Sequence, residues 1–427
     1  MAKNIFQSPK GVRDVLQDEQ PYWHAVEEAV WRVVRLYGYE RLDLPVFEET
    51  ALFQRGVGEG TDIVEKEMYT FLDKGGDSMT LRPEFTAGIV RAYIEHGMSS
   101  LPKPVKVWTM GPVFRYERPQ AGRYRQHIQF DIEALGELDP AVDFEIMCVA
   151  WHLYDDLGFR DLHFQINSIG CGQCRPDYLN RLMDYYRHHE KEICEDCRNR
   201  LQKNPLRVLD CKQSECQPVI DGAPAISGSL CGECDDHFRT LRGYLDDLGW
   251  PYQLDHRMVR GLDYYTKTVF EVWAEGIGAQ NAVCGGGRYD ALAEVLGGPP
   301  TPAVGFASGL ERIVLTLQHQ GCDVPAHRQP RLYFASQGDA AKQKVVALLT
   351  ELRAVGVDGT MGFGNRSLKA QLREANRRGA EYTVIIGEEE MSKEGTLIKT
   401  MEGGIQEFVP WEDLEAFFVR KGLCRGE

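Results

Sequence analysis

Apolar and polar side chains alternate with a period of two over residues 126–134, which predicts a β-strand. One face of this strand is apolar and carries Ile128, Phe130, Ile132 and Ala134. The opposite face is polar and carries Gln129, Asp131 and Glu133. Residues 105–116 are also strand-like, and the Pro-Gln-Ala-Gly stretch between the two strands predicts a hairpin loop.

Other segments follow the helical period or read as single buried strands. Near the N-terminus, apolar residues are spaced for one face of a helix: Trp23, Val26, Val30, Val34 and Tyr37. Further helices are predicted over 178–188 and 342–352, and strands over 268–273, 333–335 and 383–387. Residues 303–315 read as a strand, a glycine turn and a helix.

The order of these patterns divides the chain into a core domain, an insertion and a C-terminal α/β domain. Residues 319–330 are rich in Gly, Pro and polar side chains and predict a linker before the last domain. The predicted segments are 1–167 for the first part of the core, 168–254 for the insertion, 255–325 for the second part of the core and 331–427 for the C-terminal domain.

Composition excludes several classes of protein. With 427 residues and 43% hydrophobic content, the chain can bury more than one core, which excludes a disordered chain. No stretch approaches the roughly 18–20 apolar residues of a membrane span. The N-terminus lacks the apolar centre of a secretion signal. We therefore expect a soluble, cytoplasmic protein with no membrane contact.

The chain is acidic overall but basic in one place. Lys and Arg total 49 against 64 for Asp and Glu, so the net charge is −15, which excludes a general nucleic-acid coat. Residues 361–380 nevertheless carry five cations against Glu374: Arg366, Lys369, Arg373, Arg377 and Arg378. This segment is a candidate phosphate-contact surface, and a solvated helix explains it equally well.

Eight of the 12 cysteines lie inside the predicted insertion and are arranged as close pairs. The pairs are Cys171 and Cys174, Cys194 and Cys197, Cys211 and Cys216, and Cys231 and Cys234. Two cysteines with two residues between them suit tetrahedral zinc, because both thiolates can turn toward one ion. A disulfide framework and a set of unrelated free thiols are the alternatives. No His or Asn is placed to make one of these cysteines catalytic.

Arginine and glycine residues gather in three further places. The predicted hairpin loop and its flanks carry Arg115, Arg118, Arg123 and Arg125, opposed by Glu117. Planar guanidinium groups match phosphate oxygens, so a nucleotide triphosphate site is favoured over a solvated hairpin. Three consecutive glycines at 285–287 indicate close approach by a ligand or another backbone. Arg312 falls in the first turn of a predicted helix, where the helix dipole disfavours a cation.

Together these segments resemble the histidyl-tRNA synthetase family, of the bacterial type, over essentially the whole chain. Three class II signatures are recognisable: residues 37–45, the hairpin around Arg115, and Gly-Leu-Glu-Arg at 309–312. The family-specific segments are Arg-Gly-Leu-Asp-Tyr-Tyr at 260–265 and Gly-Gly-Gly-Arg-Tyr-Asp at 285–290. Residues 366–371 are similar to the family's anticodon-binding domain.

The resemblance implies an α+β fold: a six- or seven-stranded antiparallel sheet flanked by helices, with an insertion domain and a C-terminal α/β anticodon-binding domain. It implies a homodimer that binds ATP, L-histidine and tRNA(His). The implied reaction is ATP-dependent activation of histidine to histidyl-adenylate and transfer to the 3′ end of the tRNA, with Mg²⁺ bridging the β- and γ-phosphates of ATP.

The resemblance also implies roles for individual residues. Arg115 and Arg260 are the expected catalytic residues, holding the α-phosphate and neutralising the transition state. The expected ATP contacts are Arg115, Glu117, Arg123, His127 and Arg312. The expected histidine contacts are Glu84, Thr86, Gln129, Glu133, Tyr265 and Tyr289. The expected tRNA contacts are Arg366, Lys369, Arg373 and Arg377.

Two features depart from the family. His127 stands where a phenylalanine usually stacks on adenine, and its titration near neutral pH predicts pH-dependent affinity for ATP. The paired cysteines are also unusual for the family. Three other functions compete: a non-catalytic regulatory subunit in histidine biosynthesis, an inactive tRNA sensor, and a class II synthetase for proline, threonine or glycine. Arg260, Arg312 and the segment 331–427 argue against the first two, and residues 260–265 against the third.

Overall fold

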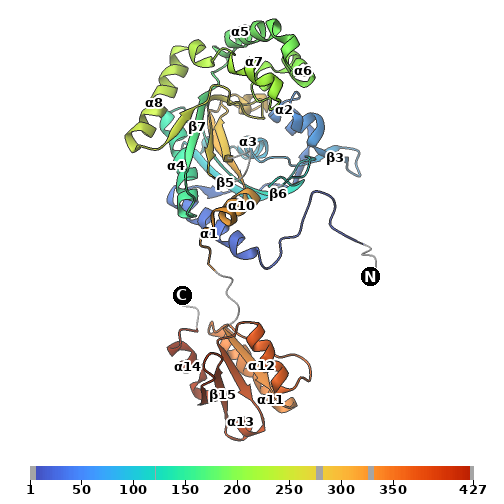
Figure 1. The fold of residues 1–427 in the computed structure, drawn as a ribbon, viewed down its shortest axis with the longest axis vertical. Coiled ribbons are helices and arrows are strands. Elements are labelled where there is room, and N and C mark those ends of the chain that lie inside the picture. The colour runs from blue at the N-terminus through green and yellow to red at the C-terminus, as the bar shows by residue number, and fades with distance from the viewer. Residues whose placement is uncertain (1–5, 121, 276–281, 326–330, 424–427) are drawn as a thin grey trace. The chain divides into compact units, whose positions relative to one another are not determined.

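The computed structural model describes residues 6–120, 122–275, 282–325 and 331–423 (Figure 1). The chain forms two compact units, Met1–Pro325 and Ala326–Glu427. No helix within the described ranges has both the length and the apolar content that crossing a bilayer requires.

The first unit is built on an eight-stranded sheet with the order β1-β5-β6-β11-β10-β9-β7-β8. Its strands are β1 (Glu40–Arg41), β5 (Val105–Phe114), β6 (Gln126–Leu135), β7 (His163–Ser168), β8 (Tyr252–Leu254), β9 (Thr266–Trp273), β10 (Ala282–Arg288) and β11 (Ala303–Gly309). The six central strands pair antiparallel, which confirms the expected sheet. The two further strands, β1 and β8, are short edge strands that pair parallel.

The predicted hairpin is formed by β5 and β6, which pair from Val105 opposite Leu135 to Phe114 opposite Gln126. Both faces of β6 are covered by other parts of the first unit, so that neither its apolar row nor its polar row faces the solvent. The polar row is not solvated: Gln129, Asp131 and Glu133 expose only 5%, 1% and 2% of their surface. This burial excludes the solvated hairpin as an explanation for the polar row.

Helices cover the two faces of the sheet. The apolar side chains of α1 (Gln20–Leu36), α4 (Pro140–Asp156), α8 (Gly232–Leu248) and α10 (Leu310–Gln320) pack on one face. The predicted apolar face of α1 is buried at Trp23, Val26, Val30 and Val34, while Tyr37 lies just beyond the helix. Helices α3 (Thr86–Glu95) and α9 (Leu292–Val295) pack on the opposite face, beside the polar row.

The chain between β7 and β8 forms a helical insertion with its own apolar core (Figure 1). Its elements include α5 (Arg175–His188), α6 (Glu195–Lys203), the 3-10 turn η4 (Pro205–Val208), α7 (Gln217–Asp221) and the long helix α8. A small separate sheet of β2 (Phe47–Glu49), β4 (Ser78–Leu81) and β3 (Tyr69–Leu72) lies near α2 (Thr50–Val57) and the π-helical turn η1 (Ile63–Glu67).

The second unit is an α/β domain around a five-stranded sheet with the order β13-β12-β14-β15-β16. Its strands are β12 (Leu332–Ser336), β13 (Thr360–Met361), β14 (Tyr382–Ile386), β15 (Gly395–Thr400) and β16 (Gln406–Pro410). Its helices are α11 (Asp339–Ala354), α12 (Leu368–Arg377), α13 (Glu388–Ser392) and α14 (Leu414–Arg420). This architecture confirms the predicted α+β class with a C-terminal α/β domain.

Candidate active site

Glu133 is the centre of a buried polar group on the face of the sheet that carries α3. Thr86 Oγ1 donates to Glu133 Oε1 at 2.8 Å, and the Tyr289 hydroxyl donates to Oε2 at 2.6 Å. The carboxyl lies across Gly305 on the adjacent strand, where an added Cβ would sit 1.6 Å from Oε2. Burial raises the Glu133 pKa to about 8, although both hydroxyl donors oppose the shift.

Asp131 and Gln129 extend this group along β6. Gln129 Nε2 donates to both carboxyl oxygens of Asp131, at 3.0 and 2.8 Å. Burial raises the Asp131 pKa well above its ordinary value, and the nearby Glu133 adds to the shift. Asp131 was visible in the period-two row but was not among the predicted site residues, because the family resemblance gave it no role.

Glu84 joins the same group from the start of α3. Its two carboxyl oxygens accept hydrogen bonds from the backbone N–H groups of Thr86 and Ala87, at 2.8 and 2.9 Å. These bonds cap the helix, whose first N–H groups have no partner within the helix itself. Arg82 fixes the preceding chain, since its guanidinium donates to the carbonyls of Pro112 at 2.8 Å and Leu44 at 2.7 Å.

Three tyrosine rings form one wall of the group. The ring of Tyr264 lies 4.7 Å from that of Tyr265 and 5.5 Å from that of Tyr289. Burial raises the Tyr265 pKa to about 12, with Arg260 opposing the shift and Glu133 adding to it. Tyr264 is a further, partly buried member that the sequence prediction left out.

Arg260 lies flat against the glycine row of β10. An added Cβ on Gly285 would fall 2.3–2.4 Å from Nη1, Cζ and Nη2 of its guanidinium group. Arg260 Nη1 also donates to Glu271 Oε1, and Glu271 is the residue of β9 that pairs with Gly285. Burial alone would lower the Arg260 pKa, but Glu271 and Tyr265 together raise it above its ordinary value. Glu271 was not predicted from the sequence, because its role depends on strand pairing.

The arginines of the hairpin form a second charged group. Arg115 follows β5, and its Nε donates to the Pro83 carbonyl at 2.7 Å. Glu117 lies between two cations: Oε1 is 3.9 Å from Arg115 Nη1, and Oε2 is 3.4 Å from Arg123 Nη1. The structure thus brings these three predicted ATP contacts together.

Arg312 connects the hairpin group to the glycine row. Its Nη1 donates to the Ala282 carbonyl at 2.6 Å, at the start of β10. Burial lowers the Arg312 pKa and the nearby Arg123 lowers it further, while Glu271 and Glu117 oppose the shift. Arg312 therefore lies within electrostatic reach of both groups.

Arg115 and Arg260 border the same set of buried carboxyl and hydroxyl groups. Burial raises the pKa of Glu84, and Arg115 is close enough to lower it in part. Glu84 in turn raises the pKa of Glu133, and Tyr265 is influenced by both Glu133 and Arg260. These mutual effects join the polar row, the tyrosines and the two arginines in one region of the first unit.

His127 differs from its predicted electrostatic behaviour. Burial lowers its pKa to about 4, and the neighbouring Arg115 lowers it further. The imidazole is therefore neutral throughout the range near pH 7. This lowered pKa does not support the predicted dependence of ATP affinity on titration of His127, because the sequence did not reveal the burial of the ring or the neighbouring Arg115.

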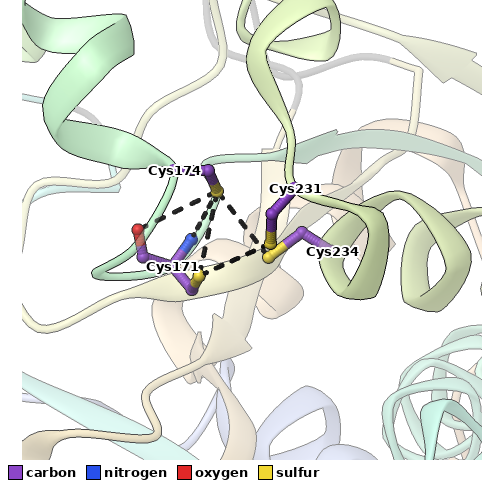
Figure 2. A group of neighbouring side chains, drawn as sticks. All are labelled: Cys171, Cys174, Cys231 and Cys234. Carbon is purple, nitrogen blue, oxygen red and sulfur yellow. Dashed lines mark hydrogen bonds between the residues drawn. The ribbon is translucent and has the colours of Figure 1, made fainter.

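The eight insertion cysteines form two groups of four, either of which can bind zinc. The first group is Cys171, Cys174, Cys231 and Cys234, whose sulfur atoms converge in Figure 2. The second group is Cys194, Cys197, Cys211 and Cys216. Within each group all sulfur atoms lie within 4.8 Å of one another. All eight are free thiols in the described structure, so the disulfide framework is not formed.

The basic residues predicted to contact tRNA lie on and just before α12 in the second unit. Arg366 Nη1 pairs with Glu374, which also accepts from Arg378 Nη2 at 2.8 Å. Lys369, Arg373 and Arg377 are exposed. Glu374 therefore neutralises part of the positive segment, and these three exposed side chains carry most of the remaining charge.

Comparisons of the sequence with family models and with known proteins agree on one family. The model "Histidyl-tRNA synthetase" matches residues 11–174 and 212–313, and the model "Anticodon binding domain" matches residues 331–421. A histidine–tRNA ligase of Dehalococcoides mccartyi is 50% identical, covering 96% of this chain and 98% of the relative. One of Desulforamulus reducens is 47% identical over the same shares.

A solved structure agrees with these sequence matches. The apo histidyl-tRNA synthetase of S. aureus superimposes with a TM-score of 0.82 at 36% identity, covering 97% of this chain and 100% of that one. Both units are therefore matched, and the resemblance predicted from the sequence is confirmed. The chain belongs to the histidyl-tRNA synthetase family.

Proposed function

We infer that the protein is a histidine–tRNA ligase. Relatives with this activity match it along nearly the whole chain, and its second unit is an anticodon-binding domain, which implies a tRNA partner. The structural observation that best supports the activity is the buried group in which Glu133 lies beside Tyr289, with Arg260 packed on Gly285 nearby. This group offers a carboxyl for an imidazole and a guanidinium for a phosphate.

For the first step we propose that the histidine carboxylate attacks the α-phosphorus of ATP. A bond forms between a carboxylate oxygen and the α-phosphorus, and the bond from the α-phosphorus to the oxygen bridging the β-phosphate breaks, so that pyrophosphate leaves and histidyl-adenylate is formed. Arg115 and Arg260 stabilise the negative charge that develops on the phosphorus oxygens, a task that needs positioning rather than a protein nucleophile. Glu117, Arg123, His127 and Arg312 contact the rest of the nucleotide. Mg²⁺ enters as part of the ATP substrate.

For histidine recognition we propose that Glu133 and Tyr265 bind the imidazole. A carboxyl group whose pKa is near 8 can share a proton with a ring that titrates in the same range. Glu84, Thr86 and Gln129 hold the ammonium group, and Tyr289 closes the pocket. Any amino acid without two ring nitrogens would leave these buried groups unpaired, which supports selectivity.

For the second step we propose that a hydroxyl of the 3′-terminal ribose of tRNA(His) attacks the histidyl carbonyl and displaces AMP. The exposed cations of α12, together with Arg366, are the proposed tRNA contacts: Lys369, Arg373 and Arg377. Their arrangement on one short helix suits the spacing of backbone phosphates.

We also propose that the protein is a cytoplasmic homodimer with residues 37–45 at the contact. Strand β1 is an edge of the large sheet, and an unpaired edge presents free backbone donors and acceptors. Leu36, just before this segment, exposes 81% of its surface. The free sheet edge, with this exposed apolar side chain beside it, supports a contact at this place.

Pyrophosphate exchange measured with each of the 20 amino acids tests the proposed function. We expect ATP–pyrophosphate exchange with histidine alone. Exchange with proline, threonine or glycine would favour a different class II synthetase. No exchange with any amino acid would favour the regulatory subunit or the tRNA sensor.

A further inference from the structure

We propose that the insertion holds two zinc ions, each bound by four cysteine thiolates, and that the two metal sites fix the loop 258–265 that carries Arg260 and Tyr265. The presence of the metals does not depend on the proposed function. Only their effect on catalysis rests on it.

The sulfur geometry of both groups fits a tetrahedral metal. Zinc–sulfur bonds of about 2.3 Å in a tetrahedron place neighbouring sulfur atoms about 3.8 Å apart. In the first group, Cys171 Sγ lies 3.8 Å from Cys174 Sγ and 3.8 Å from Cys231 Sγ. In the second group, the Sγ atoms of Cys194 and Cys211 lie 3.9 Å apart. A disulfide needs about 2.05 Å, so these distances indicate a shared ion.

Backbone N–H groups point at the sulfur atoms, as expected around metal-bound thiolates. In the first group, Cys171 N donates to Cys174 Sγ at 3.3 Å and Gln173 N to Cys171 Sγ at 3.4 Å. In the second group, Cys194 N donates to Cys216 Sγ at 3.2 Å and Gln213 N to Cys211 Sγ at 3.4 Å. Such donors stabilise negative sulfur and orient the ligands. Four protein ligands leave no open position, so the sites are structural rather than catalytic.

The first metal site joins the start of the insertion to the start of its last helix, α8. Figure 2 shows Cys171 and Cys174 approaching from the loop between β7 and α5, and Cys231 and Cys234 from the start of α8. Gly170, with φ of +65°, permits this turn, because an added Cβ would lie 2.8 Å from Cys174 Sγ.

Arg175 connects the first metal site to the histidine pocket. It follows Cys174 directly, and its Nη2 donates to the carbonyls of Gly170, at 3.1 Å, and of Tyr265. Its Nε donates to the Ile169 carbonyl at 3.0 Å. The position of the Tyr265 backbone therefore depends on the same turn that presents two of the four thiolates.

The second metal site is connected, through helix α6, to the residues that contact the loop 258–265. Helix α6 begins at this site and leads into η4. There, Asn204 Nδ2 donates to Asp263 Oδ1 at 2.7 Å, and Arg207 Nη1 donates to the Arg260 carbonyl at 3.3 Å. Arg207 Nη2 also reaches Asp62 Oδ2, at 3.2 Å, on the other side. We therefore identify Asn204 and Arg207 as positioning residues for Arg260.

The elements around the second site are too short to be stable alone. Helix α6 has 9 residues, α7 has 5 and η4 has 4. Isolated helices shorter than about 12 residues are marginal in water, and small cores usually need a metal or a disulfide. A bound metal explains how such segments can hold Asn204 and Arg207 in place.

Metal analysis of the full-length protein tests the first half of the proposal. We expect two zinc ions per chain, one after Cys174→Ser and one after Cys197→Ser. Cys322→Ser, which changes a cysteine outside both groups, should retain two. Purified wild-type protein with no zinc, or cluster variants that each still hold two zinc ions, would overturn it. If a cluster variant fails to fold, the absorption spectrum of the cobalt-substituted wild-type protein provides the test instead. The absence of the bands typical of tetrahedral cobalt–thiolate sites would overturn the assignment.

Kinetics of Arg207→Ala test the second half. We expect kcat for histidine-dependent pyrophosphate exchange to fall roughly tenfold, with both zinc ions retained and the KM for ATP little changed. In an Arg260→Ala background the same substitution should have no further effect, because Arg207 acts through Arg260. An unchanged kcat, or additive losses in the double variant, would contradict the positioning role. Wild-type exchange with histidine tests the proposed function separately.

Discussion

The side chains of the site need space that their neighbours must leave free, and the identity of a site residue does not reveal which neighbour leaves it. Glu133 lies in space that exists only because Gly305 has no side chain, and Arg260 uses the space left by Gly285 in the same way. The sequence indicated that the glycines at 285–287 allow a close approach. It could not indicate which side chain approaches, because that depends on how β9, β10, β11 and the loop before them come together.

Replacing Gly285 tests this close packing. In Gly285→Ala the new methyl group would displace the Arg260 guanidinium, so we expect kcat for histidine-dependent pyrophosphate exchange to fall about a hundredfold. Gly243→Ala is a matched control, because nothing lies within 4 Å of an added Cβ there. Equal kinetics for the two variants would show that Arg260 does not depend on the glycine.

The raised pKa of Glu133 predicts a pH-dependent stability. Its pKa in the folded protein is about 8, above the value of about 4.3 expected when unfolded. The stability that the neutral carboxyl contributes is therefore complete below about pH 4.3 and is lost as the pH rises toward 8.

Thermal unfolding of the ligand-free protein measures this effect. Between pH 5 and pH 8.5 we expect the wild-type Tm to fall by roughly 5 °C more than that of Glu133→Gln, which has no such titration. Glu402→Gln, which changes an exposed carboxyl, should follow the wild type. Parallel curves for Glu133→Gln and the wild type would contradict the raised pKa.

At the scale of elements, the periodicity of the sequence predicted individual strands and helices. It did not predict which strands pair with one another. The period-two row predicted strand β6 and its polar face, and the apolar spacing predicted helix α1. The parallel edge strands β1 and β8 have only 2 and 3 residues, too few to show any period. Likewise, Glu271 of β9 gains its role only by pairing opposite Gly285.

Helix α12 gives a prediction for the tRNA contact. We expect the double variant Lys369→Ala/Arg373→Ala to lower kcat/KM for tRNA(His) charging about tenfold and to weaken its salt dependence, because two phosphate contacts are lost. Histidine-dependent pyrophosphate exchange, which needs no tRNA, should stay unchanged. Lys393→Ala, just after α13, serves as the control. If charging falls equally in the control, or remains unaffected in the double variant, the assignment to α12 fails.

At the scale of the whole molecule, function is distributed over two units with separate cores. The family and the fold class could be predicted because their signatures are local motifs. The grouping of the cysteines could not, since eight cysteines allow many pairings and the first group joins Cys171, at the start of the insertion, to Cys231, which lies 60 residues later. The basic segment that forms α12, by contrast, was visible in the sequence despite the net charge of −15.

The central claim is that Arg260 stabilises the transition state of histidine activation. The direct measurement is the single-turnover rate of histidyl-adenylate formation in wild type and Arg260→Ala, with Arg239→Ala as a surface control. We predict a rate about a thousandfold lower for Arg260→Ala, with affinities for ATP and histidine within about threefold, and a normal rate for the control. A rate for Arg260→Ala within twofold of the wild type would contradict the account.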